Sequence, residues 1–137
     1  MKTEPTKENT LYLVMQKVFF DDIVSGDKTE EFREVKSTTA GRYLIHDKRT
    51  KYKLNPDVTN REKEYYLDDY NCGNFPFIPK DIKYLSLAVG YHKIRDTCII
   101  EVKEISFEAD MVRRNMYCFW VAVFHLGEIV EYHKKTK

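Results

Sequence analysis

The sequence predicts a single small α+β domain, built as a mixed, mostly antiparallel β-barrel with one short helix after the first strand. Three observations support this class. Segments with the β-branched and aromatic composition of strands recur along the chain. One segment after the first strand has helical spacing of its apolar residues. The predicted elements follow one another along the chain as strand, helix, strand, long insertion and three further strands, an order that favours a small α+β barrel.

The first half of the chain contains the predicted helix. Residues 11–16, "LYLVMQ", have the composition of a strand buried on both faces. Residues 17–25 follow as a helix, because their apolar positions share one buried stripe: Phe19, Phe20, Ile23 and Val24. Gly26 then provides the left-handed cap that ends a helix, since it has no Cβ to clash.

A second strand, residues 29–35, alternates in polarity after this glycine. The alternation places Phe32 on one face, and Glu31, Arg33 and Val35 on the other. Residues 37–80 differ from their surroundings and are interpreted as an insertion rather than a second domain, because they lack an apolar run of their own. Within the insertion, residues 59–70 are a possible short helix.

Strand patterns resume after the insertion. Residues 82–90 and 96–107 have period-2 alternation, and residues 116–126 form a final strand that Gly127 ends. Trp120 lies in this last strand and is interpreted as a packing residue. The domain therefore spans residues 11–131, between a flexible leader at 1–10 and a tail at 132–137.

Composition excludes several classes of protein. The chain has 137 residues, 42% hydrophobic and 33% charged, which is ordinary for one globular domain. Its net charge of +1 gives no global attraction for nucleic acid, so a basic surface must be local. The longest apolar run, residues 118–124, is too short to span a membrane. Three cysteines without a CxxC pair, and a polar leader without a secretory signal, predict a reduced, cytoplasmic protein.

A cluster of opposed charges follows the predicted helix stop. Gly26, Lys28, Glu31 and Arg33 lie within eight residues. One interpretation is a solvated turn, where exposed ion pairs contribute little, about 0–1 kcal/mol. The other interpretation is a polar cleft. A lysine and an arginine can hold a phosphate or carboxylate, while a carboxylate orients them or accepts a hydrogen bond from a base amino group.

The same four residues match the pattern G-x-K-x-x-E-x-R, which resembles the motif of the ASCH domain, a relative of the PUA fold. The preceding strand and helix, and the later segments "VGYHK", "CIIEVKEISF" and "FHLGEIVE", are similar to that family as well. The resemblance covers residues 11–35 and 82–131 and fades over 37–80.

The resemblance implies a PUA-like β-barrel in which Lys28, Glu31 and Arg33 line a cleft between barrel and helix, with Gly26 setting the turn. The cleft would suit RNA or a nucleotide-like ligand. Tyr91 and His92, on the turn "GYHKIR", would come near the cleft and stack on or hydrogen-bond a base. A solvated turn is the alternative for these two residues.

Catalysis is the second hypothesis. The resemblance includes bacterial acetylcytidine amidohydrolases, which use the motif lysine, a threonine at the position of Glu31 and a later glutamate. This chain keeps Lys28, but a carboxylate cannot act as the hydroxyl nucleophile. No glutamate in residues 108–114 matches the later one. A hydrolase acting on a modified nucleoside, or on RNA as in a ribonuclease-like relative, would therefore use Lys28 and Glu31 for proton transfer.

The insertion adds a possible RNA contact. Residues 42–53 contain one acid, Asp47, and a set of cations and rings suited to phosphate contact and base stacking: Arg42, Tyr43, Lys48, Arg49, Lys51, Tyr52 and Lys53. A basic solvated loop is the alternative.

No metal or other cofactor is expected, because the four histidines share no ligand spacing with each other or with the cysteines. A third hypothesis is a protein-interaction module with a non-catalytic cleft, favoured by the acidic, aromatic residues 64–70. The sequence does not indicate an oligomeric state.

Overall fold

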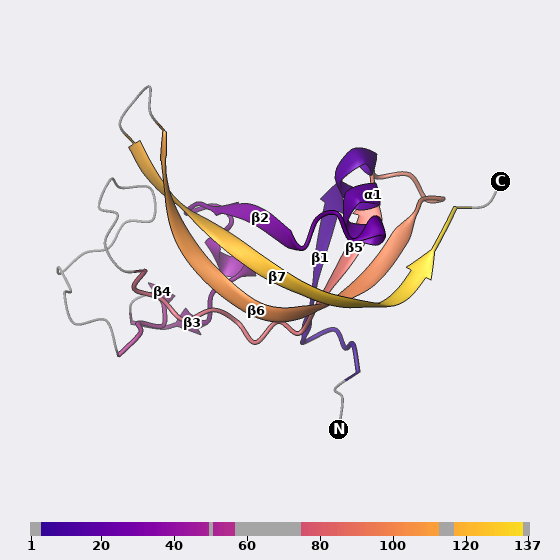
Figure 1. Ribbon diagram of the computed structural model, residues 1–137. Coiled ribbons are helices and arrows are strands. Elements are labelled where there is room, and N and C mark those ends of the chain that lie inside the picture. Colours follow the sequence, from indigo (N-terminus) through magenta and orange to yellow (C-terminus); the bar gives the residue numbers. More distant parts are fainter. Residues whose placement is uncertain (1–3, 50, 57–74, 113–116, 136–137) are drawn as a thin grey trace. The chain divides into compact units, whose positions relative to one another are not determined.

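The computed structural model describes residues 4–49, 51–56, 75–112 and 117–135 (Figure 1). These residues belong to two compact units. Unit 1 comprises Met1–Glu31, Asp81–Glu104 and Phe124–Lys137, and unit 2 comprises Phe32–Lys80 and Ile105–Val123. Each unit is described below by itself.

The elements follow one another in this order: β1 (Thr10–Met15), α1 (Lys17–Ser25), β2 (Glu30–Val35), η1 (Ala40–Arg42), β3 (His46–Asp47), β4 (Lys51–Tyr52), β5 (Tyr84–Val89), β6 (Thr97–Val112) and β7 (Tyr117–His133). Hydrogen bonds join five strands into one sheet in the order β1-β5-β6-β7-β2, and β3 pairs with β4. β1 runs parallel to β5, whereas β5 and β6 are antiparallel. The predicted mixed α+β class is confirmed.

A closed barrel is not found among the described residues, because β1 and β2 stand at the two ends of the strand order. The described part of the chain also contains no helix long and apolar enough to cross a membrane.

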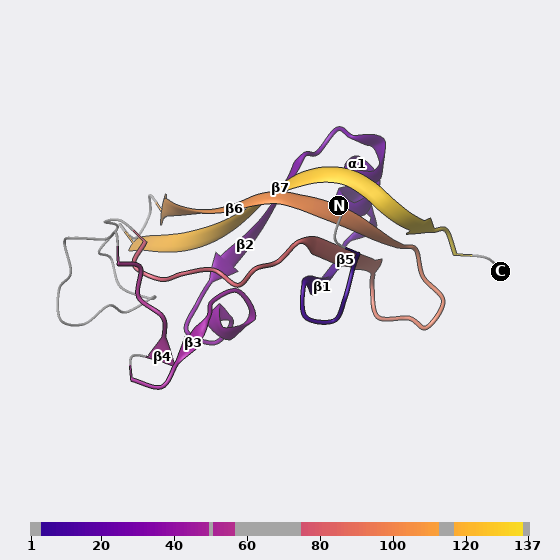
Figure 2. The same cartoon turned by 90° about the horizontal axis from the view of Figure 1, so that it is seen from below.

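The core of unit 1 lies between α1 and its part of the sheet. Leu13, Leu87 and Cys98 face one another across β1, β5 and β6, and all three are buried. α1 adds Phe20 and Ile23, three residues apart and therefore on one helix face. Figure 2 shows β1 and β5 side by side in this unit. Burying this apolar surface is what stabilises the position of α1.

Two expectations for unit 1 are wrong in detail. Phe19, expected in the buried stripe, is 46% exposed, because its neighbour Phe20 faces the sheet instead. Gly127 does not end the last strand, because β7 continues through it to His133. A Cβ at Gly127 would lie 3.1 Å from the Cβ of Glu101, so this glycine permits the Glu101 side chain to pass close to the β7 backbone.

Unit 2 is built around the β3–β4 hairpin, which the extended segment 76–80 supports. Ile45 N donates to Ile78 O at 3.1 Å, and Ile78 N donates to Lys53 O at the same distance. Tyr43, Leu44, Tyr52 and Phe77 are buried there. Trp120 is buried too and packs edge-on against Phe75, with ring centroids 4.9 Å apart. Its predicted packing role is confirmed.

Part of the predicted insertion, residues 50 and 57–74, lies outside the described residues. The possible helix at 59–70, the acidic aromatic segment 64–70 and Cys72 all belong to this part. The described remainder of the insertion, residues 37–49, 51–56 and 75–80, contains η1, β3 and β4.

Candidate functional site

The turn between α1 and β2 positions the charge cluster. Gly26 has φ of 85°, the left-handed conformation predicted for it, and its N–H donates to Ile23 O at 3.1 Å. Lys28 N donates to Asp22 O at 3.0 Å. These two bonds satisfy carbonyls at the end of α1 and turn the chain back, so that Lys28 lies beside the helix it has just left.

Lys28 and Glu31 are in direct contact in unit 1. Lys28 Nζ lies 2.8 Å from Glu31 Oε1, and the two side chains are 22% and 6% exposed. A carboxylate this deeply buried requires a charged or hydrogen-bonding partner, because removing it from water is costly. The prediction that Glu31 faces away from Phe32 is confirmed, since Glu31 is buried while Phe32 is exposed.

A half-exposed aromatic ring completes this group. Lys28 Nζ lies 5.0 Å from the centroid of the Phe19 ring, within the range of a cation–π interaction. Phe19 therefore belongs to the site, although the sequence pattern assigned it to the core. Adjacent residues of a helix point in different directions, so Phe19 and Phe20 do not face the sheet equally. The adjacency of the two phenylalanines is the sequence signal that could have indicated an exposed ring here.

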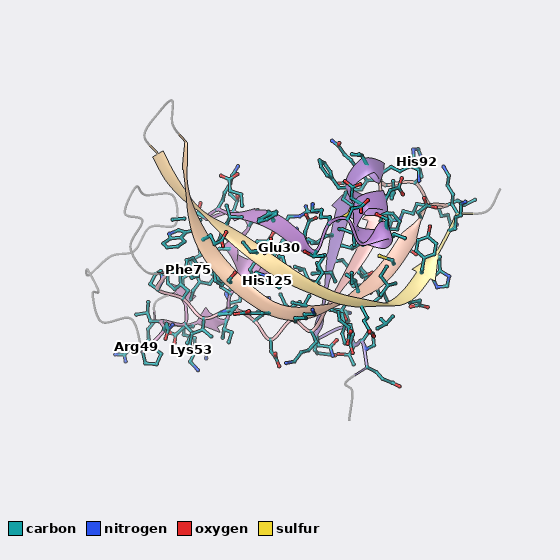
Figure 3. The ribbon with its side chains drawn as sticks, in the orientation of Figure 1. Glu30, Arg49, Lys53, Phe75, His92 and His125 are labelled. Carbon is teal, nitrogen blue, oxygen red and sulfur yellow. The ribbon has the colours of Figure 1, made fainter. Side chains whose placement is uncertain are left out.

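The start of β2 is anchored to β7 by a backbone hydrogen bond and a side-chain pair. Leu126 N donates to Thr29 O at 2.9 Å. The next residue, Glu30, accepts from His125 Nδ1, with 3.0 Å between Nδ1 and Oε2 (Figure 3). Because successive residues of a strand point to opposite faces, this pair lies on the face opposite Glu31. The sequence analysis missed it, because the two residues are far apart in the chain.

A second buried carboxylate lies near the start of α1. Asp96 Oδ1 accepts from Lys135 N at 2.7 Å, and Asp96 Oδ2 lies 3.3 Å from Lys17 Nζ. The backbone hydrogen bond from Lys135, together with Lys17, holds the pKa of Asp96 below its usual value. Hydrogen bonds to Asp21 and Asp96 raise the pKa of Lys17. This group joins α1, the β5–β6 connection and the end of the chain.

The other expected ligand residues, Arg33, Tyr91 and His92, lie on two segments of the chain. Arg33 is half-buried and belongs to unit 2. Tyr91 and His92 lie on the connection between β5 and β6, where Tyr91 is 86% exposed (Figure 3). Asp96, at the end of this connection, contacts Lys17 at the start of α1, whereas Lys28 follows the end of that helix.

The hairpin of unit 2 presents its cations but not its tyrosines. Arg42, Lys48, Arg49, Lys51 and Lys53 are all exposed. Tyr43 and Tyr52 are 2% and 5% exposed, because both pack in the core of unit 2. The expectation that these two rings stack on RNA bases is wrong.

The arrangement in unit 1 brings together a cation, a carboxylate and an aromatic ring: Lys28, Glu31 and Phe19. Among the described residues, no three His, Cys, Asp or Glu side chains are grouped as metal ligands. Comparison with protein-family models, with curated proteins and with solved structures found no match.

Proposed function

We propose that this protein binds RNA or a nucleotide-like ligand through Lys28 and Glu31, as an ASCH-like domain with a PUA-like barrel. The observation that carries the proposal is the position of Lys28 between the buried carboxylate of Glu31 and the half-exposed ring of Phe19. Each of these groups has a natural counterpart in a nucleotide. The ammonium group suits a phosphate, the carboxylate suits a base amino group, and the ring suits a base face.

The burial of the pair supports a site rather than a solvated turn. Exposed ion pairs are common and contribute little to stability. Here, by contrast, Glu31 is almost completely removed from water, and a chain gains no stability from such a pair over well-packed apolar residues. Retaining a buried carboxylate at the edge of the fold is therefore reasonable if it recognises a ligand.

Hydrolysis of a modified nucleoside or of RNA is the second candidate. The direct contact of 2.8 Å between Lys28 Nζ and Glu31 Oε1 favours it, because proton transfer needs heavy atoms at hydrogen-bond distance. In such a reaction, Glu31 would accept a proton from a water whose oxygen forms a bond to the acyl carbon or the phosphorus, while Lys28 stabilises the developing negative charge. The bond to the leaving nitrogen or oxygen would then break, and Glu31 would return the proton to that leaving group.

Thermal shift assays with free nucleoside monophosphates, modified nucleosides and short single-stranded RNAs test both candidates. Lys28→Ala alone would remove the Lys28 ammonium group from the buried Glu31 carboxylate, so the better variant is the pair Lys28→Met/Glu31→Gln, which removes both charges. Lys83→Met, at an exposed lysine paired with Asp81, is the control. Stabilisation of the wild type and the control, but not of the paired variant, supports binding at this site. Formation of a hydrolysis product from a modified nucleoside would favour the hydrolase candidate over binding alone.

A further inference from the structure

We propose that the β3–β4 hairpin of unit 2 is a second RNA contact that binds the phosphate backbone alone and does not recognise bases. The basic hairpin is defined by four exposed cations: Lys48, Arg49, Lys51 and Lys53. This inference rests on the proposed function, because it assumes that RNA is the ligand. It goes beyond that function by assigning a separate surface and a mode of recognition.

The basic hairpin contains more cations than acids. Asp47 is the one acidic residue between positions 42 and 53. Its Oδ1 accepts from the backbone N–H of Arg49 at 2.7 Å, so the carboxylate is turned toward the hairpin backbone. Arg49 lies in the turn of the hairpin, and Lys53 lies beyond its open end, next to Ile45; Figure 3 labels both side chains. The cations are therefore distributed along the hairpin. A phosphate chain that runs along the hairpin therefore meets several cations in succession.

The rings of the hairpin are unavailable to bases. Tyr43 and Tyr52 are buried. Their faces are also covered by neighbouring side chains: Arg42 Cζ lies 6.0 Å from the centre of the Tyr43 ring, and Lys51 Nζ lies 5.7 Å from that of Tyr52. The His46 ring packs on Tyr52 at 5.4 Å. Base stacking needs a free ring face, and these contacts leave none on either tyrosine.

The open end of the hairpin is hydrogen-bonded to the neighbouring segments. Lys53 N donates to Ile45 O at 2.9 Å, Ile78 N donates to Lys53 O, and Lys80 N donates to Tyr43 O at 2.7 Å. Buried Tyr52 packs edge-on against Phe77, which lies on the same supporting segment. The cations are therefore presented from a fixed scaffold, which lowers the entropy lost when they bind a phosphate chain.

Contacts to phosphates without contacts to bases have a measurable consequence. Affinity depends on salt and on the number of phosphates neutralised, and it does not depend on the bases. For a single strand, each lost phosphate contact makes the slope of log K against log salt shallower by about 0.7, so four contacts amount to about 3. When the salt concentration is lowered from about 0.3 M to 0.1 M, the affinity of the wild type should therefore rise about 20-fold more than that of a protein lacking these four contacts.

The test uses fluorescence anisotropy on the full chain with two strands of about 12 units. One is oligouridylate, and the other is an abasic ribose-phosphate strand of equal length. The hairpin variant carries Lys48→Gln, Arg49→Gln, Lys51→Asn and Lys53→Gln. Asparagine is chosen at position 51 because Lys51 has φ of 70°, a conformation that asparagine tolerates. The control removes four exposed lysines of unit 1: Lys7, Lys93, Lys103 and Lys134.

We expect the hairpin variant to lose affinity equally for both strands and to show the shallower salt slope, while the control stays close to wild type. A hairpin variant that binds as wild type, or that loses affinity only for the strand with bases, overturns the inference, as does equal loss in the control.

The paired variant Lys28→Met/Glu31→Gln separates this inference from the proposed function. If the paired variant loses binding of free nucleotides while the hairpin variant keeps it, the two sites are distinct and both proposals stand. If the hairpin variant loses oligouridylate binding and the paired variant binds RNA and nucleotides as wild type, the proposed function fails at its site and the hairpin contact survives. If the wild type binds neither strand, the hairpin contact fails.

Discussion

Lys28 Nζ lies 2.8 Å from Glu31 Oε1 where the chain leaves α1 and enters β2, and Glu31 is almost completely buried. Lys28 thus forms an ion pair with the buried carboxylate and remains partly exposed to solvent beside the Phe19 ring. This dual position makes the pair testable both through stability and through ligand binding.

Replacing Lys28 by alanine removes the ion pair between Lys28 and the buried Glu31 carboxylate. Breaking one partner of a buried pair costs about 3–5 kcal/mol, so we expect the free energy of unfolding to fall by about 3 kcal/mol. Urea denaturation measures this change. Lys36→Ala is the matched control, because its partner Glu34 is at 3.6 Å and both side chains are about half exposed. The control should lose at most about 1 kcal/mol, and an equal loss in both variants would contradict the account.

Gly26 is required for its backbone conformation alone. Its φ is 85°, and a Cβ built on it would meet no atom within 4 Å. Gly26→Ala should therefore destabilise by about 1–2 kcal/mol through the left-handed conformation, without steric conflict. Gly26→Asn should cost less, because asparagine visits this region more readily. Equal losses for the two variants, measured by urea denaturation, would show that the conformation is not the cause.

Asp96 makes stability depend on pH at the acid end. Its folded pKa is lowered, chiefly by the hydrogen bond from Lys135 N–H, from the model-compound value of 3.8. The folded state therefore favours the ionised carboxylate. Its contribution to stability is complete above about pH 4 and is lost as the pH falls through the lower, folded pKa.

Lys17 makes stability depend on pH at the alkaline end. Its pKa is raised above 10.5, so its contribution to stability is present below that value and is lost as the pH rises through the folded pKa.

Urea midpoints of wild type and Asp96→Asn, measured from about pH 2 to pH 8, test this linkage. The difference between the two proteins should be constant above about pH 4 and should shrink below it. Asp81→Asn, at an exposed carboxylate paired with Lys83, is the control and should show a small difference throughout. A wild-type advantage that persists undiminished at the lowest pH would contradict the assignment.

Cys98 should be unreactive in the native protein. The thiol is buried, and burial raises its pKa to about 11, so little thiolate exists at neutral pH. In a Cys72→Ser/Cys118→Ser background, iodoacetamide at about pH 8 should modify Cys98 only after urea is added. Rapid alkylation of the native protein would show that the β6 strand opens far more easily than its packing implies.

Local pattern was sufficient for most elements of the fold. The end of the helix at Gly26 followed from glycine's access to positive φ. The spacing of Lys28 and Glu31, three residues apart, placed the two charges close together after the helix. The predicted end of the last strand was wrong. Gly127 resembles a strand terminator in sequence, yet β7 continues through it. A glycine is suited to this position because the Glu101 side chain occupies the space that a Cβ would need.

Contacts between distant segments account for the rest. Tyr52 looked like an exposed ring among cations, and only its packing against Phe77 shows that it is buried. Pairs such as Lys17 with Asp96 and His125 with Glu30 join residues far apart in the chain, and no local spacing indicates them. The open ring of Phe19 likewise depends on which of two adjacent phenylalanines the sheet covers.

The central claim is that Lys28 and Glu31 bind a nucleotide-like ligand, and an NMR titration tests it most directly. Amide shifts of the labelled protein would be followed on adding each ribonucleoside 5′-monophosphate and a short single-stranded RNA. The account predicts that the changes concentrate at Phe19 and residues 26–31 and disappear in Lys28→Met/Glu31→Gln. Saturating ligand that shifts other residues and leaves these unchanged would contradict it.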